Sequence, residues 1–197
     1  MLKKELFALL AVGAVACDDV EGDDDGHSHS HSHGLITAVD LSFTAASDGS
    51  NVVYRWSDAE DDGSPEIDDI VLVDGEAYDL EVFFYNELEE PVEDVTPDIL
   101  DQGDEHQIFF TGSAVESDIV DHGYEDEDSK GLPLGLDNVM DSVVAGNGDL
   151  TIILQHLPEE NDSPTKTEGL EDQVANGGIG SIGGDTDVSA TFNLTVE

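Results

Sequence analysis

The sequence predicts an all-β protein, a single antiparallel β-sandwich of immunoglobulin-like type with about nine strands and one or two short helices. Apolar and polar residues alternate over most of residues 35–197, which is the period of a strand with one buried face. Turn-forming pairs such as Asp48-Gly49 and Asp74-Gly75 separate the alternating runs. Hydrophobic residues make up 38% of the chain, which is enough to build a core.

The predicted strands follow one another with short connections. Their ranges are 35–43, 51–57, 68–73, 78–84, 106–113, 119–124, 135–144, 149–157 and 188–196. The first places Leu35, Thr37, Val39, Leu41 and Phe43 on one face. The last alternates apolar residues strictly with Ser, Thr and Asn, so we expect it to be half-buried.

Two short helices interrupt this pattern. Thr96-Pro97-Asp98 predicts a capping residue followed by proline at the first helical position, and Gly103 would end that helix. A second helix is expected near residues 166–175, before the glycine-rich loop 177–184. This loop has no strand directly before it and no basic residues around it, so we expect a connection rather than an anion site.

Residues 1–16 have the pattern of a lipoprotein signal peptide. Lys3 and Lys4 precede a short apolar stretch, residues 6–15, which is too short for a comfortable membrane span. The small residues before Cys17, the only cysteine, resemble a lipobox, although Ala14 stands where leucine is usual. We therefore predict that Cys17 carries lipid and anchors the chain to a membrane of the cell envelope. The alternative is an ordinary signal peptide cleaved after Ala16.

Residues 17–34 form a predicted disordered tether, acidic at first and then rich in histidine, and residues 35–197 form the folded domain. Acidic residues directly after the cysteine resemble surface-export signals of some lipoproteins, whereas aspartate there resembles a retention signal in others. Periplasmic and surface-exposed locations therefore both stay open. The 48 acidic residues against five Lys and Arg give a formal net charge of -43, which argues against nucleic acid as a partner.

Several stretches resemble a family of small bacterial lipoproteins labelled "type 1 periplasmic binding fold superfamily protein". They are Asn-Glu-Leu-Glu-Glu-Pro-Val-Glu-Asp-Val-Thr at 86–96, residues 104–110, Gly-Asp-Leu-Thr-Ile-Ile-Leu-Gln-His-Leu-Pro at 148–158, residues 183–187 and the last strand. The resemblance extends over nearly all of residues 35–197. Its label implies a two-lobed fold that alternates strands with helices, whereas the residue pattern predicts a sandwich. The resemblance supplies no catalytic residues.

An alternating His-Ser run is the strongest chemical signal. His27, His29, His31 and His33 are spaced so that neutral imidazoles can chelate Zn²⁺, Cu²⁺ or Ni²⁺. The alternative is a low-complexity spacer in which histidine only adds solubility.

A second metal site is a hypothesis for the folded domain. His106 begins one predicted strand and His156 ends another, so antiparallel pairing would bring them to the same rim, and His122 would point there as well. Glu105 or Glu87 could complete a zinc site. The alternative is that each histidine hydrogen-bonds a loop.

Residues 58–63 carry acidic side chains at Asp58, Glu60 and Asp62 before Gly63, which resembles the start of a calcium loop. Residues 126–131 repeat the shape, but Lys130 occupies a ligand position. Neither continues into the full EF-hand pattern, so an acidic turn is the alternative for both.

No nucleophile elbow, phosphate-binding loop or zinc-protease motif occurs in the sequence, and we predict that the protein is not an enzyme. Two functions follow. The first is an envelope-anchored accessory protein that captures or buffers zinc or a similar ion, with an outer-membrane receptor or metal transporter as partner. The second is a structural or interaction module that calcium stiffens.

Overall fold

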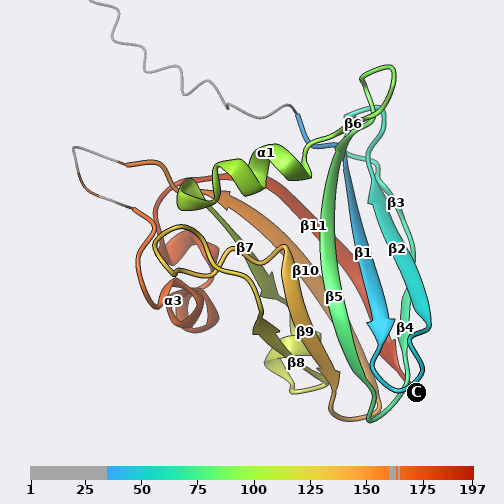
Figure 1. Cartoon of the computed structure of the whole chain (residues 1–197). Coiled ribbons are helices and arrows are strands. Elements are labelled where there is room, and N and C mark those ends of the chain that lie inside the picture. Colours follow the sequence, from blue (N-terminus) through green and yellow to red (C-terminus); the bar gives the residue numbers. More distant parts are fainter. Residues whose placement is uncertain (1–34, 160–162, 164) are drawn as a thin grey trace, which may run out of the picture. The chain divides into compact units, whose positions relative to one another are not determined.

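The computed structural model describes residues 35–159, 163 and 165–197, which form two β-sheets packed around one apolar layer (Figure 1). The all-β sandwich predicted from the sequence is confirmed. The strands are β1 (Ala38–Ala45), β2 (Asn51–Ser57), β3 (Glu66–Ile67), β4 (Ile70–Leu72), β5 (Ala77–Asn86), β6 (Glu93–Asp94), β7 (His106–Thr111), β8 (Val120–Tyr124), β9 (Asp137–Ser142), β10 (Gly146–His156) and β11 (Asp185–Val196). The helices are α1 (Thr96–Asp101), α2 (Ser113–Glu116) and α3 (Leu170–Gly177), with 3-10 turns η1 (Gly103–Glu105) and η2 (Ile179–Ser181).

The larger sheet has the strand order β3-β2-β1-β5-β9-β8, with β6 paired to β5, and the smaller sheet has the order β4-β11-β10-β7. The described pairs of neighbouring strands are antiparallel, with one exception. Strands β4 and β11 run parallel, and Ile70 lies opposite Leu194. This parallel pair departs from the prediction. The chain passes from β3 in one sheet to β4 in the other within two residues, so β4 joins the edge of β11 without a hairpin.

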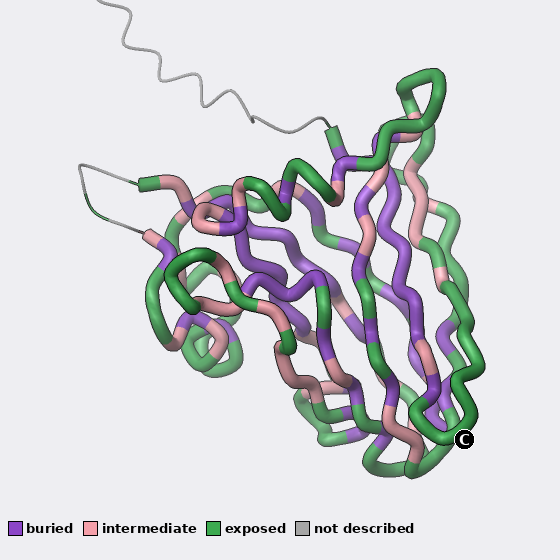
Figure 2. Tube along the Cα trace, in the orientation of Figure 1, coloured by how far each residue is buried: buried purple, intermediate pink, exposed green. Residues whose placement is uncertain are grey.

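Alternating side chains from both sheets fill the layer between them. The core includes Val39, Leu41 and Phe43 of β1, Leu80, Val82 and Phe84 of β5, and Ala190, Phe192 and Leu194 of β11. Central strand β1 is buried along almost its whole length (Figure 2), and the side chains of Arg55 and Asn51 in β2 cover its outer face through hydrogen bonds to Asp40 and Ser42. Burial of these faces is the main favourable term for the fold.

The smaller sheet also buries part of its outer face. Phe109 of β7 and Ile153 of β10 pack with Leu170 and Val174 of α3 in a second apolar cluster. This explains why the sequence is continuously apolar at Ile108-Phe109-Phe110 and Ile152-Ile153-Leu154: both faces of the sheet are covered there.

Two predicted boundaries shift for local reasons. Strand β7 ends at Thr111, two residues early, because Gly112 has φ of 103° and its missing Cβ would lie 2.4 Å from the carbonyl oxygen of Asp149. The predicted cap of α1 was wrong. Val95 occupies the N-cap position, while the Thr96 hydroxyl accepts a hydrogen bond from the backbone N–H of Phe84 at 2.9 Å.

Replacement of Phe192, a fully buried side chain opposite Leu150, tests the core. We expect Phe192→Ala to lower the free energy of unfolding by about 3–5 kcal/mol, because it removes buried area and leaves a cavity. Val144→Ala is the control, since Val144 is half-exposed and outside the strands, and it should cost less than about 1 kcal/mol. Urea unfolding followed by circular dichroism measures both; equal losses would contradict this assignment of the core.

Candidate functional site

Two of the predicted histidines meet where β7 begins and β10 ends. His106 and His156 are direct partners across the antiparallel pair, and their rings stack with centroids 4.8 Å apart at 19°. Both residues are buried. The Nδ1–H of His106 faces the carbonyl oxygen of Gln102 at 3.0 Å, so the turn after α1 fixes the ring orientation. The antiparallel strands thus place the pair at one rim of the smaller sheet.

Two carboxylates flank this pair of rings. Glu105 Oε2 lies 3.7 Å from His156 Nε2, and Asp187 Oδ2 lies 3.6 Å from His106 Nε2, with the Asp187 side chain only 3% exposed. Sequence reasoning included Glu105 but missed Asp187. The register of β11 against β10 shifts at a bulge between Leu154 and Gln155, so the position of Asp187 could not be counted from the strand pattern.

Burial controls the titration of His156. It lowers the pKa of the imidazole below its ordinary value, and the neighbouring His106 lowers this pKa further, whereas Asp187 and Glu105 act in the opposite direction. Burial therefore favours the neutral form of the His156 ring, and the stacked arrangement suits a structural contact.

His122 lies apart from the other two. It belongs to β8 in the larger sheet, where its Nε2 contacts Asn138 Oδ1 at 3.0 Å and its ring stacks on Phe110 at 3.8 Å. Phe110 is four residues along β7 from His106, a distance of roughly 13 Å. The structure therefore does not bring His122 to the rim as predicted, because β8 pairs with β9 rather than extending the sheet of β7.

Within residues 35–159, 163 and 165–197, no group of three or more His, Cys, Asp or Glu side chains is arranged to hold a metal ion. Glu87, the alternative ligand in the prediction, instead contacts the guanidinium of Arg55 at 3.2 Å and accepts a hydrogen bond from the Ser57 hydroxyl. Burial lowers the pKa of His122 as well, so this ring is also favoured in its neutral form.

The first acidic loop forms a closed turn. Asp58 accepts hydrogen bonds from the backbone N–H groups of Asp62 at 3.1 Å and Gly63 at 2.9 Å, and Asp62 accepts one from Ser64 at 2.9 Å. Glu60 and Glu66 help to line a surface hollow of about 260 Å³ beside the turn. Part of the predicted ligand set is therefore used to cap backbone groups, as in the acidic-turn alternative.

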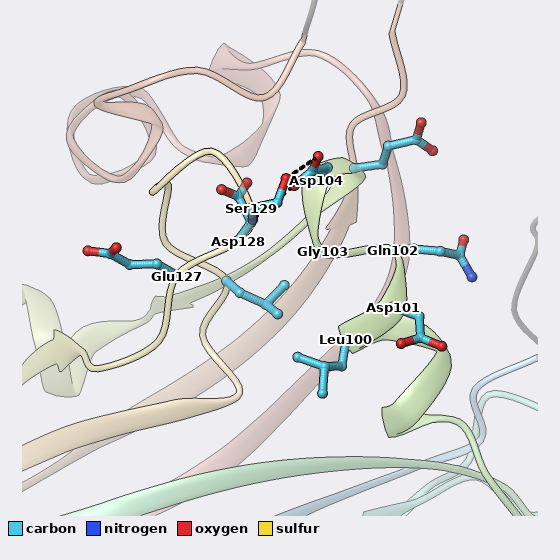
Figure 3. Close-up of a pocket in the computed structure, with 10 residues that line it drawn as sticks. Leu100, Asp101, Gln102, Gly103, Asp104, Glu127, Asp128 and Ser129 are labelled. Atoms are coloured by element: carbon cyan, nitrogen blue, oxygen red, sulfur yellow. Dashed lines mark hydrogen bonds between the residues drawn. The ribbon is translucent and has the colours of Figure 1, made fainter.

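A larger hollow of about 560 Å³ lies between the η1 turn and the second acidic loop (Figure 3). Asp104, Glu105, Glu127 and Asp128 are among its lining residues, and the Ser129 hydroxyl bonds to Asp104 at 2.8 Å. At this place the buried Lys166 ammonium contacts Asp128 Oδ2 at 2.9 Å. Sequence reasoning missed this pair, since 38 residues separate its members and no motif links them.

The remaining predicted site residues, Cys17 and the tract His27, His29, His31 and His33, lie outside the described residues. Among the described helices, none is long and apolar enough to cross a membrane.

The depressed pKa of His156 predicts how stability depends on pH. The unfolded imidazole titrates at about 6.5, so between its folded pKa and pH 6.5 the unfolded chain binds more protons. The stability that His156 contributes is complete above about pH 6.5 and is lost as the pH falls below that value. The difference in free energy of unfolding between wild type and His156→Gln should therefore shrink from pH 7.5 to pH 5.

Chemical denaturation at several pH values measures this difference. His122→Gln should show the same sign, because burial depresses its pKa too, and the non-titrating Val144→Ala variant should give a difference that does not change with pH. If the free energy of unfolding changes with pH in the same way for wild type and both histidine variants, the two rings titrate as they do in the unfolded chain, and the prediction is wrong.

Comparisons with known proteins identify no relative. No family model, no curated protein and no solved structure matches this chain. The resemblance to the small lipoprotein family therefore stays a prediction, and the function has to be argued from the residues themselves.

Proposed function

We propose that this protein is a lipid-anchored cation-binding protein of the cell envelope, in which the tract His27, His29, His31 and His33 captures Zn²⁺ or a similar divalent ion. Four imidazoles at alternate positions supply nitrogen ligands of the kind that zinc, copper and nickel prefer. The tract begins ten residues after Cys17, so a lipid on that cysteine would keep the captured ion close to the membrane.

One observation in the folded domain carries the proposal. The backbone N–H of Asp58 donates to the carbonyl oxygen of Thr37 at 2.7 Å, which holds the acidic loop against the segment where the described chain begins. His33 precedes Thr37 by four residues, a span of at most about 14 Å. We therefore propose that the carboxylates of Asp58, Glu60 and Asp62 add oxygen ligands to an ion that the tract captures.

The charge of the whole sequence supports the same function. A formal net charge of -43 raises the local concentration of divalent cations around the molecule. The described basic side chains, Arg55, Lys130 and Lys166, each lie within 4 Å of a carboxylate, so they offer little repulsion. Zinc needs three or four ligands and accepts both imidazole nitrogen and carboxylate oxygen. The proposed role is capture or buffering for a membrane receptor or metal transporter, without catalysis.

Replacement of all four tract histidines by serine tests the proposal. We expect calorimetric titration at pH 7.5 to show Zn²⁺ binding by the full chain and its loss in the variant, because only imidazole nitrogen is removed. The melting temperature without metal should stay unchanged. Binding by the wild type should weaken toward pH 5, where imidazole is protonated. Full zinc binding by the serine variant would refute a role for the tract.

The acidic loop is tested separately with Glu60→Gln, which removes one charge without touching the caps made by Asp58 and Asp62. We expect a several-fold weaker zinc affinity. The matched control is Glu116→Gln in α2, which removes the same charge elsewhere. If both variants weaken binding equally, the loop acts only through the net charge.

A second candidate function is protein interaction, and the sandwich edge favours it. Between β2 and β4 a hollow of about 320 Å³ is lined by Phe43, Tyr54 and Tyr78, and the nearby Val52 and Val73 are at least half-exposed. Such apolar surface on an acidic domain is typical of a binding face. Calcium at the loop of residues 58–63 would stiffen this module. A rise in melting temperature with Ca²⁺ but not Zn²⁺ would favour it.

A further inference from the structure

Lys166 and Asp128 form an ion pair that is excluded from solvent. The Nζ of Lys166 lies 2.9 Å from Oδ2 of Asp128, and both side chains are 0% exposed. Lys166 also donates a hydrogen bond to the carbonyl oxygen of Gly103 at 2.8 Å. Lysine is almost never fully buried, and burial of an isolated ion pair costs more than a surface pair gains.

The carboxyl group of Asp128 is held in a fixed orientation. Its Oδ1 accepts hydrogen bonds from the backbone N–H groups of Lys130 at 2.8 Å and Leu132 at 2.9 Å. Oδ2 is the oxygen that faces the amine. Because a carbon–oxygen bond is about 1.2 Å long, Nζ lies within about 4.1 Å of the carboxyl carbon, and reacting atoms in near-attack geometry are about 3–3.5 Å apart.

Burial also favours the uncharged forms of the two groups. The pKa of Lys166 is lowered, and loss of hydration is the largest cause. Burial raises the pKa of Asp128, but the Lys166 ammonium and the two backbone donors outweigh it and leave that pKa low. The charged pair therefore dominates near pH 7. Transfer of one proton from Lys166 to Asp128 produces a neutral amine beside a neutral carboxylic acid, a minor form that can react.

We propose that Lys166 and Asp128 condense to form an intramolecular isopeptide bond. In the neutral pair, the lone pair of Nζ attacks the carboxyl carbon of Asp128, and a bond forms between nitrogen and carbon. A proton passes from Nζ to the hydroxyl on Oδ2, which leaves as water. The product is an amide whose carbonyl oxygen is Oδ1. One amine and one carboxylic acid become one amide and one water, so no oxidant or other reactant is needed.

The surrounding backbone suits each stage of this reaction. The N–H groups of Lys130 and Leu132 point at Oδ1, where negative charge develops in the tetrahedral intermediate, so they form an oxyanion hole. The carbonyl oxygen of Gly103 can accept the N–H that remains on the amide. Gly103 and Asp128 both line the 560 Å³ hollow in Figure 3, so this hollow adjoins the pair.

The bond would link two segments that lie outside the sheets. Asp128 stands in the loop between β8 and β9, and Lys166 stands in the connection from β10 to α3. The cross-link joins residues 38 positions apart in the sequence. It stabilises the folded state as a disulfide would, because it reduces the conformational freedom of the unfolded chain. The chain has one cysteine, so it has no internal disulfide that could serve this purpose.

The mass of the denatured full chain tests the proposal. We expect wild type to weigh about 18 Da less than its residues, after any cleavage and lipidation at Cys17, require, for the loss of one water. Lys166→Arg keeps the positive charge but removes the nucleophile, and Asp128→Ala removes the acid, so both should have their full mass. The matched control for the second variant is Asp121→Ala in β8, which removes an exposed aspartate that takes no part in the proposed reaction, and it should still lose one water.

Proteolysis at acidic residues should then release one branched peptide that contains both Lys166 and Asp128. Circular dichroism of each variant establishes that it is folded, so that a missing bond cannot be ascribed to unfolding. A folded wild type of full mass would overturn the proposal. Loss of water in folded Lys166→Arg would overturn it too, because that result indicates a succinimide at an aspartate rather than an isopeptide bond.

Discussion

The apolar layer between the two sheets holds the fold together against the repulsion of a formal net charge of -43. Compaction brings like charges closer, so every buried side chain has to offset part of that repulsion. The alternation in β11 shows how this is done. Val188, Ala190 and Phe192 point into the layer, while the residues between them are polar and point outward. Salt weakens the repulsion but hardly affects the core, so the fold should tolerate high ionic strength well.

Acidic side chains also take part in building the loops. Asp126 accepts hydrogen bonds from the backbone N–H groups of Gly135 and Leu136, and Asp58 and Asp128 each accept two. These backbone N–H groups donate to a side-chain carboxylate, which has two oxygens and can accept several hydrogen bonds at once. Some of the acidic excess is therefore structural, which is why a carboxylate count along the sequence is a poor guide to cation sites.

The sequence predicted features that depend on local periodicity and missed those that depend on register or distant pairing. The alternation in β1, β5 and β11 was sufficient to predict the sandwich, because one face of each strand enters the core. It was also sufficient to bring His106 and His156 together, since antiparallel neighbours place a strand start beside a strand end. It could not place Asp187, which depends on a bulge, or the partner of Lys166, which lies in a distant loop.

The histidines of the folded domain are already engaged in its packing. In the folded domain, burial lowers the pKa values of His122 and His156, which keeps these rings neutral and so in the protonation state that binds metals. Both rings are also engaged in stacking contacts, His122 with Phe110 and His156 with His106. The tract differs from them in sequence, because its four histidines alternate with serine and no apolar residue stands among them. The proposed capture at the tract needs neutral imidazole, so it should weaken as the pH falls through about 6.5, whereas His122 and His156 contribute to the stability of the folded domain.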